Sequence, residues 1–106
     1  MNGVLGYLGL GLRAGTVVVG VDAVRRSLQA RECRCVVIAS DASQRAREKV
    51  LRLAAALDVP RVEGPQAAEL GAGLGKPPVM AAGVRDPALA DGIVRAAAAG
   101  QGVTEA

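Results

Sequence analysis

The residue types that most enzymes use for catalysis are scarce in this chain of 106 residues. There is no histidine, so the commonest general acid or base is missing. The pair Cys33 and Cys35 has no imidazole that could activate a thiol as a nucleophile. Two cysteines without histidine also leave a zinc ion short of ligands. We therefore expect a protein that is not an enzyme and that uses no metal and no cofactor.

The stretch Gly15–Leu28 (GTVVVGVDAVRRSL) holds the clearest binding chemistry. A β-branched run leads into Gly20 and apolar residues then recur at helical spacing, so a strand is predicted to turn into a helix at this glycine. The N-terminus of a helix presents free N–H groups and a partial positive charge. Arg25 and Arg26 add two cations in the first turns. These features favour an anion, which we interpret as RNA phosphate.

A simpler interpretation of the charged residues stays open. Asp22 and Arg26 stand four residues apart, a spacing that suits an ion pair on a solvated helix face, and Arg25 is then an ordinary surface arginine. A second basic group is also most simply a solvated face: Arg45, Arg47, Lys49 and Arg52. Helix capping explains the aspartates at the predicted element boundaries: Asp22, Asp41, Asp58 and Asp86.

None of the glycine-rich segments matches a nucleotide-binding loop. The segment 9–14 fits G-x-G-x-x-A, but that fingerprint needs a strand before it, and the preceding residues have a helical pattern. The glycines at 71, 73 and 75 have the wrong spacing, and Pro77 removes an N–H group that a phosphate would use. No nucleotide cofactor is expected.

The apolar patterns predict helices and strands in strict alternation, in the order αβαβαβαβα. Helices are expected at 3–14, about 21–31, 43–57, 66–72 and 87–100, and strands at 16–19, 35–40, 60–63 and 79–84. Asp41 and Gln44 have the spacing of a capping box for the third helix. The runs at 35–40 and 79–84 are apolar throughout, which is typical of central strands covered on both faces. The pattern therefore predicts the α/β class, as a three-layer α/β/α sandwich.

Composition fits one small domain, 1–100, followed by a flexible tail at 101–106 after Gly100. The formal net charge is +3, and eleven of the thirteen cations are arginine, a residue that suits bidentate phosphate contacts. No stretch reaches the about 18 apolar residues of a membrane span. Cys33 and Cys35 are expected as buried or half-buried free thiols, which indicates a reducing compartment. We therefore expect a cytoplasmic protein without a membrane partner.

Several segments, in order, resemble one family. They are LGLxxRAG at 8–15, the glycine turn at 20, VVIASDAS at 36–43, VP at 59–60, ELG to GK at 69–76, and DPxLADxI at 86–93. Together they resemble the kink-turn RNA-binding ribosomal-protein superfamily, in its small bacterial YlxQ-like branch. The resemblance covers residues 4 to about 96. It implies a mixed four-stranded sheet within the sandwich.

The resemblance also implies a function and a surface. It implies binding of structured RNA without catalysis. We accordingly expect a monomer that binds kink-turn-like RNA, such as ribosomal RNA, with a ribosome or translation-factor partner. The surface is implied to consist of three loops at one end of the sheet: Gly20–Arg26, Ser40–Gln44 and Gly83–Pro87. We accordingly predict these RNA-binding residues: Gly20, Val21, Asp22, Arg25, Arg26, Arg13, Ser43 and Arg85.

The chain departs from the family's turn at two base-recognising positions. Asp22 stands where the family has Asn or Lys, and Ala23 stands where it has Glu or Gln. Arg25 replaces Thr, and Arg26 keeps the final cation. Because Ala23 offers no polar atom to a base edge, an alternative function is a protein-interaction module that keeps the fold and has lost kink-turn recognition.

Overall fold

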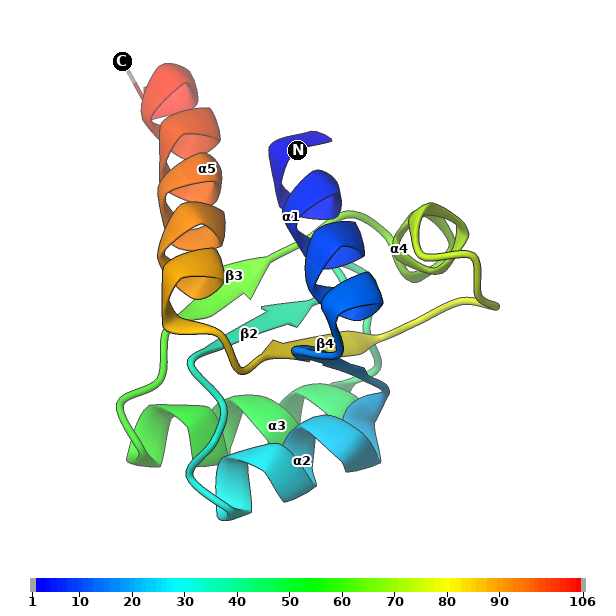
Figure 1. Cartoon of the computed structure of the whole chain (residues 1–106), viewed down its shortest axis with the longest axis vertical. Helices are drawn as coiled ribbons and strands as arrows, with labels where there is room; N and C mark the ends of the chain where they lie inside the picture. Colours follow the sequence, from blue (N-terminus) through cyan, green and yellow to red (C-terminus); the bar gives the residue numbers. More distant parts are fainter. Residues whose placement is uncertain (1, 106) are drawn as a thin grey trace.

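The computed structural model describes residues 2–105, in which five helices and four strands alternate (Figure 1). The helices are α1 (Asn2–Ala14), α2 (Val21–Gln29), α3 (Gln44–Ala56), α4 (Ala67–Gly73) and α5 (Pro87–Glu105). The strands are β1 (Val17–Val19), β2 (Cys35–Ile38), β3 (Arg61–Glu63) and β4 (Ala81–Val84). The predicted order αβαβαβαβα is confirmed.

Helix α5 continues to Glu105, so the predicted end of this helix at Gly100 is wrong. A glycine ends a helix when it adopts a left-handed conformation, and otherwise it only costs about 1 kcal/mol of helix propensity. No proline follows Gly100 to stop the helix. The strands β2 and β4 are shorter than predicted, because the runs at 39–40 and 79–80 belong to loops.

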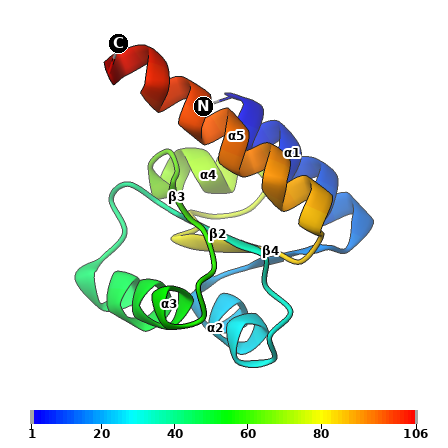
Figure 2. The ribbon, with the colours of Figure 1, turned by 90° about the vertical axis from the view of Figure 1, so that its left-hand side faces the viewer.

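The four strands form one mixed sheet in the order β1-β4-β2-β3. Strand β4 pairs antiparallel with both β1 and β2, and β2 pairs parallel with β3. Helices α1, α4 and α5 cover one face of the sheet, and α2 and α3 cover the other (Figure 2). The predicted three-layer sandwich with a mixed four-stranded sheet is therefore confirmed.

Strand β2 separates two apolar cores by alternation of its side chains. Cys35 and Val37 pack with α1, α4 and α5, whereas Val36 and Ile38 pack with α2 and α3. All four residues of the strand are buried, as expected for a central strand with a helix layer on each face. No helix within the described residues combines the length and the apolar character that a membrane crossing needs.

Cys33 and Cys35 are both buried and both free, as predicted. Cys33 precedes β2 and contributes to the core beneath α2 and α3, while Cys35 belongs to the opposite core. Burial raises the pKa of both thiols, and desolvation followed by the charge of Cys33 raises the pKa of Cys35 to about 12. The two thiols therefore stay protonated in the folded protein at neutral pH.

The segment between α4 and β4 passes very close to the backbone of α4 at Gly71. A Cβ atom at Gly71 would overlap the backbone of Lys76 and Pro77. The Gly71 carbonyl also accepts a hydrogen bond from the Lys76 N–H at 2.9 Å. Glycine at this position lets the segment fold back over α4 before β4 begins.

We expect Gly71→Ala to destabilise the protein by about 1–3 kcal/mol, because the segment at Lys76 and Pro77 must move to make room for the methyl group. Gly6→Ala is the matched control, since no atom lies within 4 Å of its added Cβ and alanine favours a helix over glycine by about 0.5–1 kcal/mol. Thermal unfolding measures both effects. A Gly71→Ala variant as stable as the wild type would contradict the close approach.

The raised pKa of Cys35 makes stability depend on alkaline pH. The unfolded chain loses this proton near pH 9.0 and the folded chain only near 12, so the stabilisation is complete below pH 9 and is lost as pH rises toward 12. Over this window the free energy of unfolding should fall by about 1.4 kcal/mol per pH unit because of this group. Urea unfolding at increasing pH measures the slope, and Cys35→Ala should flatten it. Identical slopes would contradict the prediction.

Candidate nucleic-acid interface

The direction of β4 divides the loops between two ends of the sheet. Strands β1 and β2 run antiparallel to β4, so they end where β4 begins, and Val19 lies opposite Ala82. Strand β3 is parallel to β2 and ends on the same side. We call this side the Gly20 end, and the side where β4 ends the Arg85 end.

Two of the three predicted loops meet at the Gly20 end. The Gly20 N–H donates to the Ala81 carbonyl at 2.9 Å, and the Ala39 N–H donates to the Met80 carbonyl at 2.8 Å. These bonds bring the segments 20–26 and 40–44 to the start of β4. Met80, directly before β4, lies with them, since the Ser43 hydroxyl donates to its sulfur.

The third predicted loop, Gly83–Pro87, lies at the Arg85 end, so its predicted place beside the other two is wrong. Arg85 Nη2 donates to the Gly15 carbonyl at 2.8 Å, and its Nη1 lies 4.0 Å from Glu32 Oε1. Arg13 lies in the last turn of α1, shortly before Gly15. The predicted place of Arg13 and Arg85 in the surface around Gly20 is therefore wrong, because Gly15 and Thr16, shortly after Arg13, accept hydrogen bonds from Arg85 at the opposite end of the sheet.

Helix α2 begins without a side-chain cap. Its N-cap residue, Gly20, has φ 104° and ψ 149°, a backbone conformation that favours glycine. The Val24 N–H donates to the Gly20 carbonyl at 3.0 Å. Within the described part of the chain, the N–H groups of Val21, Asp22 and Ala23 have no acceptor. Three donors at the positive end of the helix dipole are thus left without an acceptor in this part of the chain.

The helices that follow α2 have side-chain acceptors at their first turns. Ser43 Oγ accepts from the Ala46 N–H at 3.1 Å in α3, and Asp86 Oδ1 accepts from the Ala88 N–H at 2.8 Å in α5. In α4 the acceptor is Asp41 Oδ1, which lies 2.7 Å from the Ala67 nitrogen. The predicted capping box of Asp41 for α3 is therefore wrong, because the loop turns its carboxylate toward α4.

The charged side chains of α2 point in different directions. Arg25 lines an open groove between α2 and α3, whereas Arg26 lines a hollow on another side of α2 that it shares with Arg85. Asp22 Oδ1 lies 4.0 Å from Lys49 Nζ of α3. The ion pair of Asp22 with Arg26 that the sequence allowed is not formed among the described residues.

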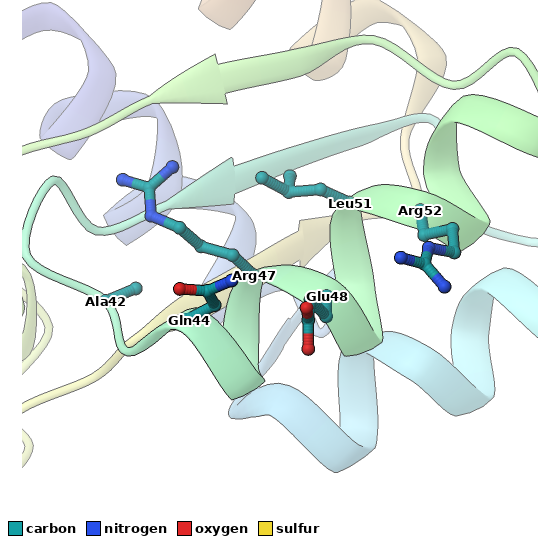
Figure 3. A pocket seen from close by; sticks show the side chains of 6 residues that line it. All are labelled: Ala42, Gln44, Arg47, Glu48, Leu51 and Arg52. Carbon is teal, nitrogen blue, oxygen red and sulfur yellow. The ribbon is translucent and has the colours of Figure 1, made fainter.

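Arg47 has a structural role that its exposed neighbours do not share. Its Nη2 donates to the carbonyls of Ala39 and Ser40 at 3.3 and 3.1 Å, and to Glu63 Oε1 at 2.7 Å. Figure 3 shows Arg47 pointing toward the strands and away from Arg52, which lies on the side of α3 nearer α2. Arg47 therefore fixes the loop at 40–44 instead of belonging to a solvated face.

Met80 is a residue of the Gly20 end that was not among the predicted site residues. Its side chain is 39% exposed, and the Ser43 hydroxyl donates to its sulfur at 3.9 Å. It offers an apolar surface beside the bare start of α2. Its place follows from the antiparallel direction of β4, which the sequence pattern does not encode.

We expect Asp41→Ala to lower the free energy of unfolding by about 1 kcal/mol, because the first turn of α4 loses its acceptor. Gln66→Ala is the matched control: Gln66 occupies the N-cap position of α4 but makes no side-chain cap hydrogen bond, so its effect should stay within about 0.5 kcal/mol. Urea unfolding compares the two. An equal loss in both variants would contradict the remote cap.

Comparison with known proteins identifies relatives of this fold. A protein of unknown function from Bacillus halodurans superimposes with a TM-score of 0.82 at 25% identity, over 87% of this chain and 93% of that one. A 15.5kD RNA binding protein from Giardia lamblia superimposes with a TM-score of 0.71 at 22% identity, over 89% and 81% of the two chains. No curated protein matches the sequence. The family model of the ribosomal protein L7Ae/L30e/S12e/Gadd45 family matches residues 4–93, and the chain belongs to this family.

Proposed function

We propose that the protein binds structured RNA through the Gly20 end and catalyses no reaction. The observation that carries this proposal is the bare start of α2, where three N–H groups lack acceptors within the described residues. Membership of the ribosomal protein family supports it, as does the structural likeness to the Giardia lamblia RNA binding protein. The proposal keeps these predicted RNA-binding residues: Gly20, Val21, Asp22, Arg25, Arg26 and Ser43.

Phosphate is the ligand group that this surface fits best. Free N–H groups and the helix dipole stabilise an anion at the start of α2. The exposed Arg25 lines the groove between α2 and α3, and Arg26 lies on another side of α2, over the hollow that it shares with Arg85. Asp22 opposes an anion, but its carboxylate lies 4.0 Å from the ammonium of Lys49. The backbone donors, which carry no sequence information, dominate the contact.

A sharply kinked RNA suits such a surface because a kink displays phosphates and splayed bases on one side. Ala23 has no polar side-chain atom for a base edge, so we propose recognition by shape and phosphate position. The exposed side chain of Met80 can contact an unstacked base. Kink-turn RNA, including ribosomal RNA, is therefore the proposed ligand class.

The proposed setting is a cytoplasmic ribonucleoprotein associated with the ribosome or with a translation factor, in which the protein acts as a monomer. Arg13 and Arg85 are not included in the proposed interface. Arg85 already donates to the Gly15 carbonyl at 2.8 Å and lies near Glu32, which gives it a structural role at the Arg85 end.

We expect Val21→Pro to weaken binding of a kink-turn RNA about tenfold relative to Val21→Ala. Proline is tolerated at the first position of a helix, so the substitution removes one N–H donor while the helix persists. A hydrogen bond to a charged group contributes about 1.5–3 kcal/mol, and about 1.4 kcal/mol corresponds to a tenfold change in affinity. Val21→Ala loses the same contacts of the valine side chain but keeps the donor. Filter binding at low salt measures both variants, and thermal unfolding confirms that both fold.

Equal affinity of the two variants would contradict phosphate binding at the start of α2. If the wild type bound no kinked RNA even at low salt and instead copurified with a protein partner, the alternative of a protein-interaction module would replace the proposed function.

A further inference from the structure

A basic groove runs between α2 and α3 beyond the bare helix start. It has a volume of about 410 Å³, and its walls carry Arg25 from α2 with Arg45, Lys49 and Arg52 from α3. Glu48 is the one carboxylate among the lining residues. These five side chains sum to +3, which equals the formal charge of the whole chain. The other charged side chains of the sequence cancel formally, so the groove holds a positive excess equal to that of the whole sequence.

The cations of α3 outnumber the carboxylates that could neutralise them. Arg45 and Lys49 are four residues apart, and Lys49 and Arg52 are three apart, so both pairs are neighbours of like charge, which destabilise a helix by about 0.2–0.5 kcal/mol each. Glu48 stands three residues after Arg45 and four before Arg52, spacings that favour the helix, but among the described residues it forms no ion pair with either arginine. One carboxylate among four cations leaves a surplus of positive charge that an external anion can neutralise.

The charges in the groove are also available for binding. Arg25, Arg45 and Arg52 are exposed, and among the described residues they form no ion pair and donate no side-chain hydrogen bond. Lys49 lies 4.0 Å from Asp22, which joins the groove to the first turn of α2. By contrast, Arg47 on the same helix is committed to Glu63 at 2.7 Å.

The groove begins at the proposed RNA-binding surface and leads away from it. Arg45 lies in the first turn of α3, next to Ser43 at the Gly20 end. Arg52 lies seven residues farther along, about 10 Å at the helical rise of about 1.5 Å per residue. Figure 1 shows α2 and α3 side by side beneath the sheet. The row of cations therefore extends from the proposed anion site along a length that corresponds to about three phosphates of one nucleic-acid strand.

We propose that the groove between α2 and α3 holds the phosphate backbone of a double-stranded RNA stem that flanks the kink. This inference rests on the proposed function and adds a second contact region to it. The stem enters beside Arg45 and its backbone follows Lys49 and Arg52 along α3, with Arg25 on the opposite wall. Arginine suits this task because its guanidinium can contact phosphate oxygens in a bidentate manner.

The test compares two kink-turn RNAs, one with a long flanking stem and one with that stem cut back to the kink. Arg45→Ala/Arg52→Ala removes two charges from the groove, and Arg61→Ala/Arg95→Ala removes two charges elsewhere as the matched control. On the long-stem RNA, the groove variant should reduce the slope of log K against log salt by about two units. Between about 50 and 200 mM salt, the wild type should then lose about tenfold more affinity than the variant.

The control variant should keep the wild-type slope, and the groove variant should bind the short-stem RNA as the wild type does. If the groove variant keeps the wild-type slope on the long-stem RNA while the wild type binds both RNAs, the groove assignment is overturned and the proposed function stands. If the wild type binds neither RNA, the proposed function fails and this inference fails with it.

Discussion

The hydrogen bonding of β4 to both β1 and β2 is the interaction on which the arrangement of this molecule depends. Both pairings are antiparallel, so the segment before β4 meets the ends of β1 and β2, and the segment after it leaves at the other end. The strand consists of small residues, and a Cβ at Gly83 would lie 3.2 Å from Val18 and 3.3 Å from Cys33. Small side chains therefore let this central strand fit between two helix layers.

The first turn of α2 lacks the side-chain acceptor that the first turns of α3, α4 and α5 have, and this difference distinguishes the Gly20 end of the sheet. Side chains of Ser43, Asp41 and Asp86 satisfy the first turns of α3, α4 and α5. Gly20 has no side chain that could do the same for α2, and its positive φ excludes the usual capping residues. The sheet then places this bare helix start beside the loops that enter α3 and β4. The glycine at position 20 leaves the start of α2 uncapped, and the strand order determines which loops lie next to it.

Arginines of similar sequence context serve different purposes in this fold. Arg47 and Arg85 hold loops through carbonyl oxygens and carboxylates, whereas Arg45 and Arg52 are exposed around the groove between α2 and α3. The helical period separates Arg47 from its neighbours on α3. Because α2 and α3 pack together, Arg25 joins a like-charged row that lies some twenty residues away in sequence. Unpaired like charges would be too costly to bury in a core, but they remain hydrated in an open groove.

The sequence by itself determined the alternation of elements, the three layers, the buried free thiols and the glycine turn into α2. These features follow from local periodicity and from the apolar runs of β2 and β4, which a central strand between two helix layers requires. Only the tertiary structure decided which loops meet, because the direction of β4 depends on pairing between segments far apart in the chain. It therefore placed Arg85 at one end and Met80 at the other, and it turned Asp41 toward α4 rather than α3.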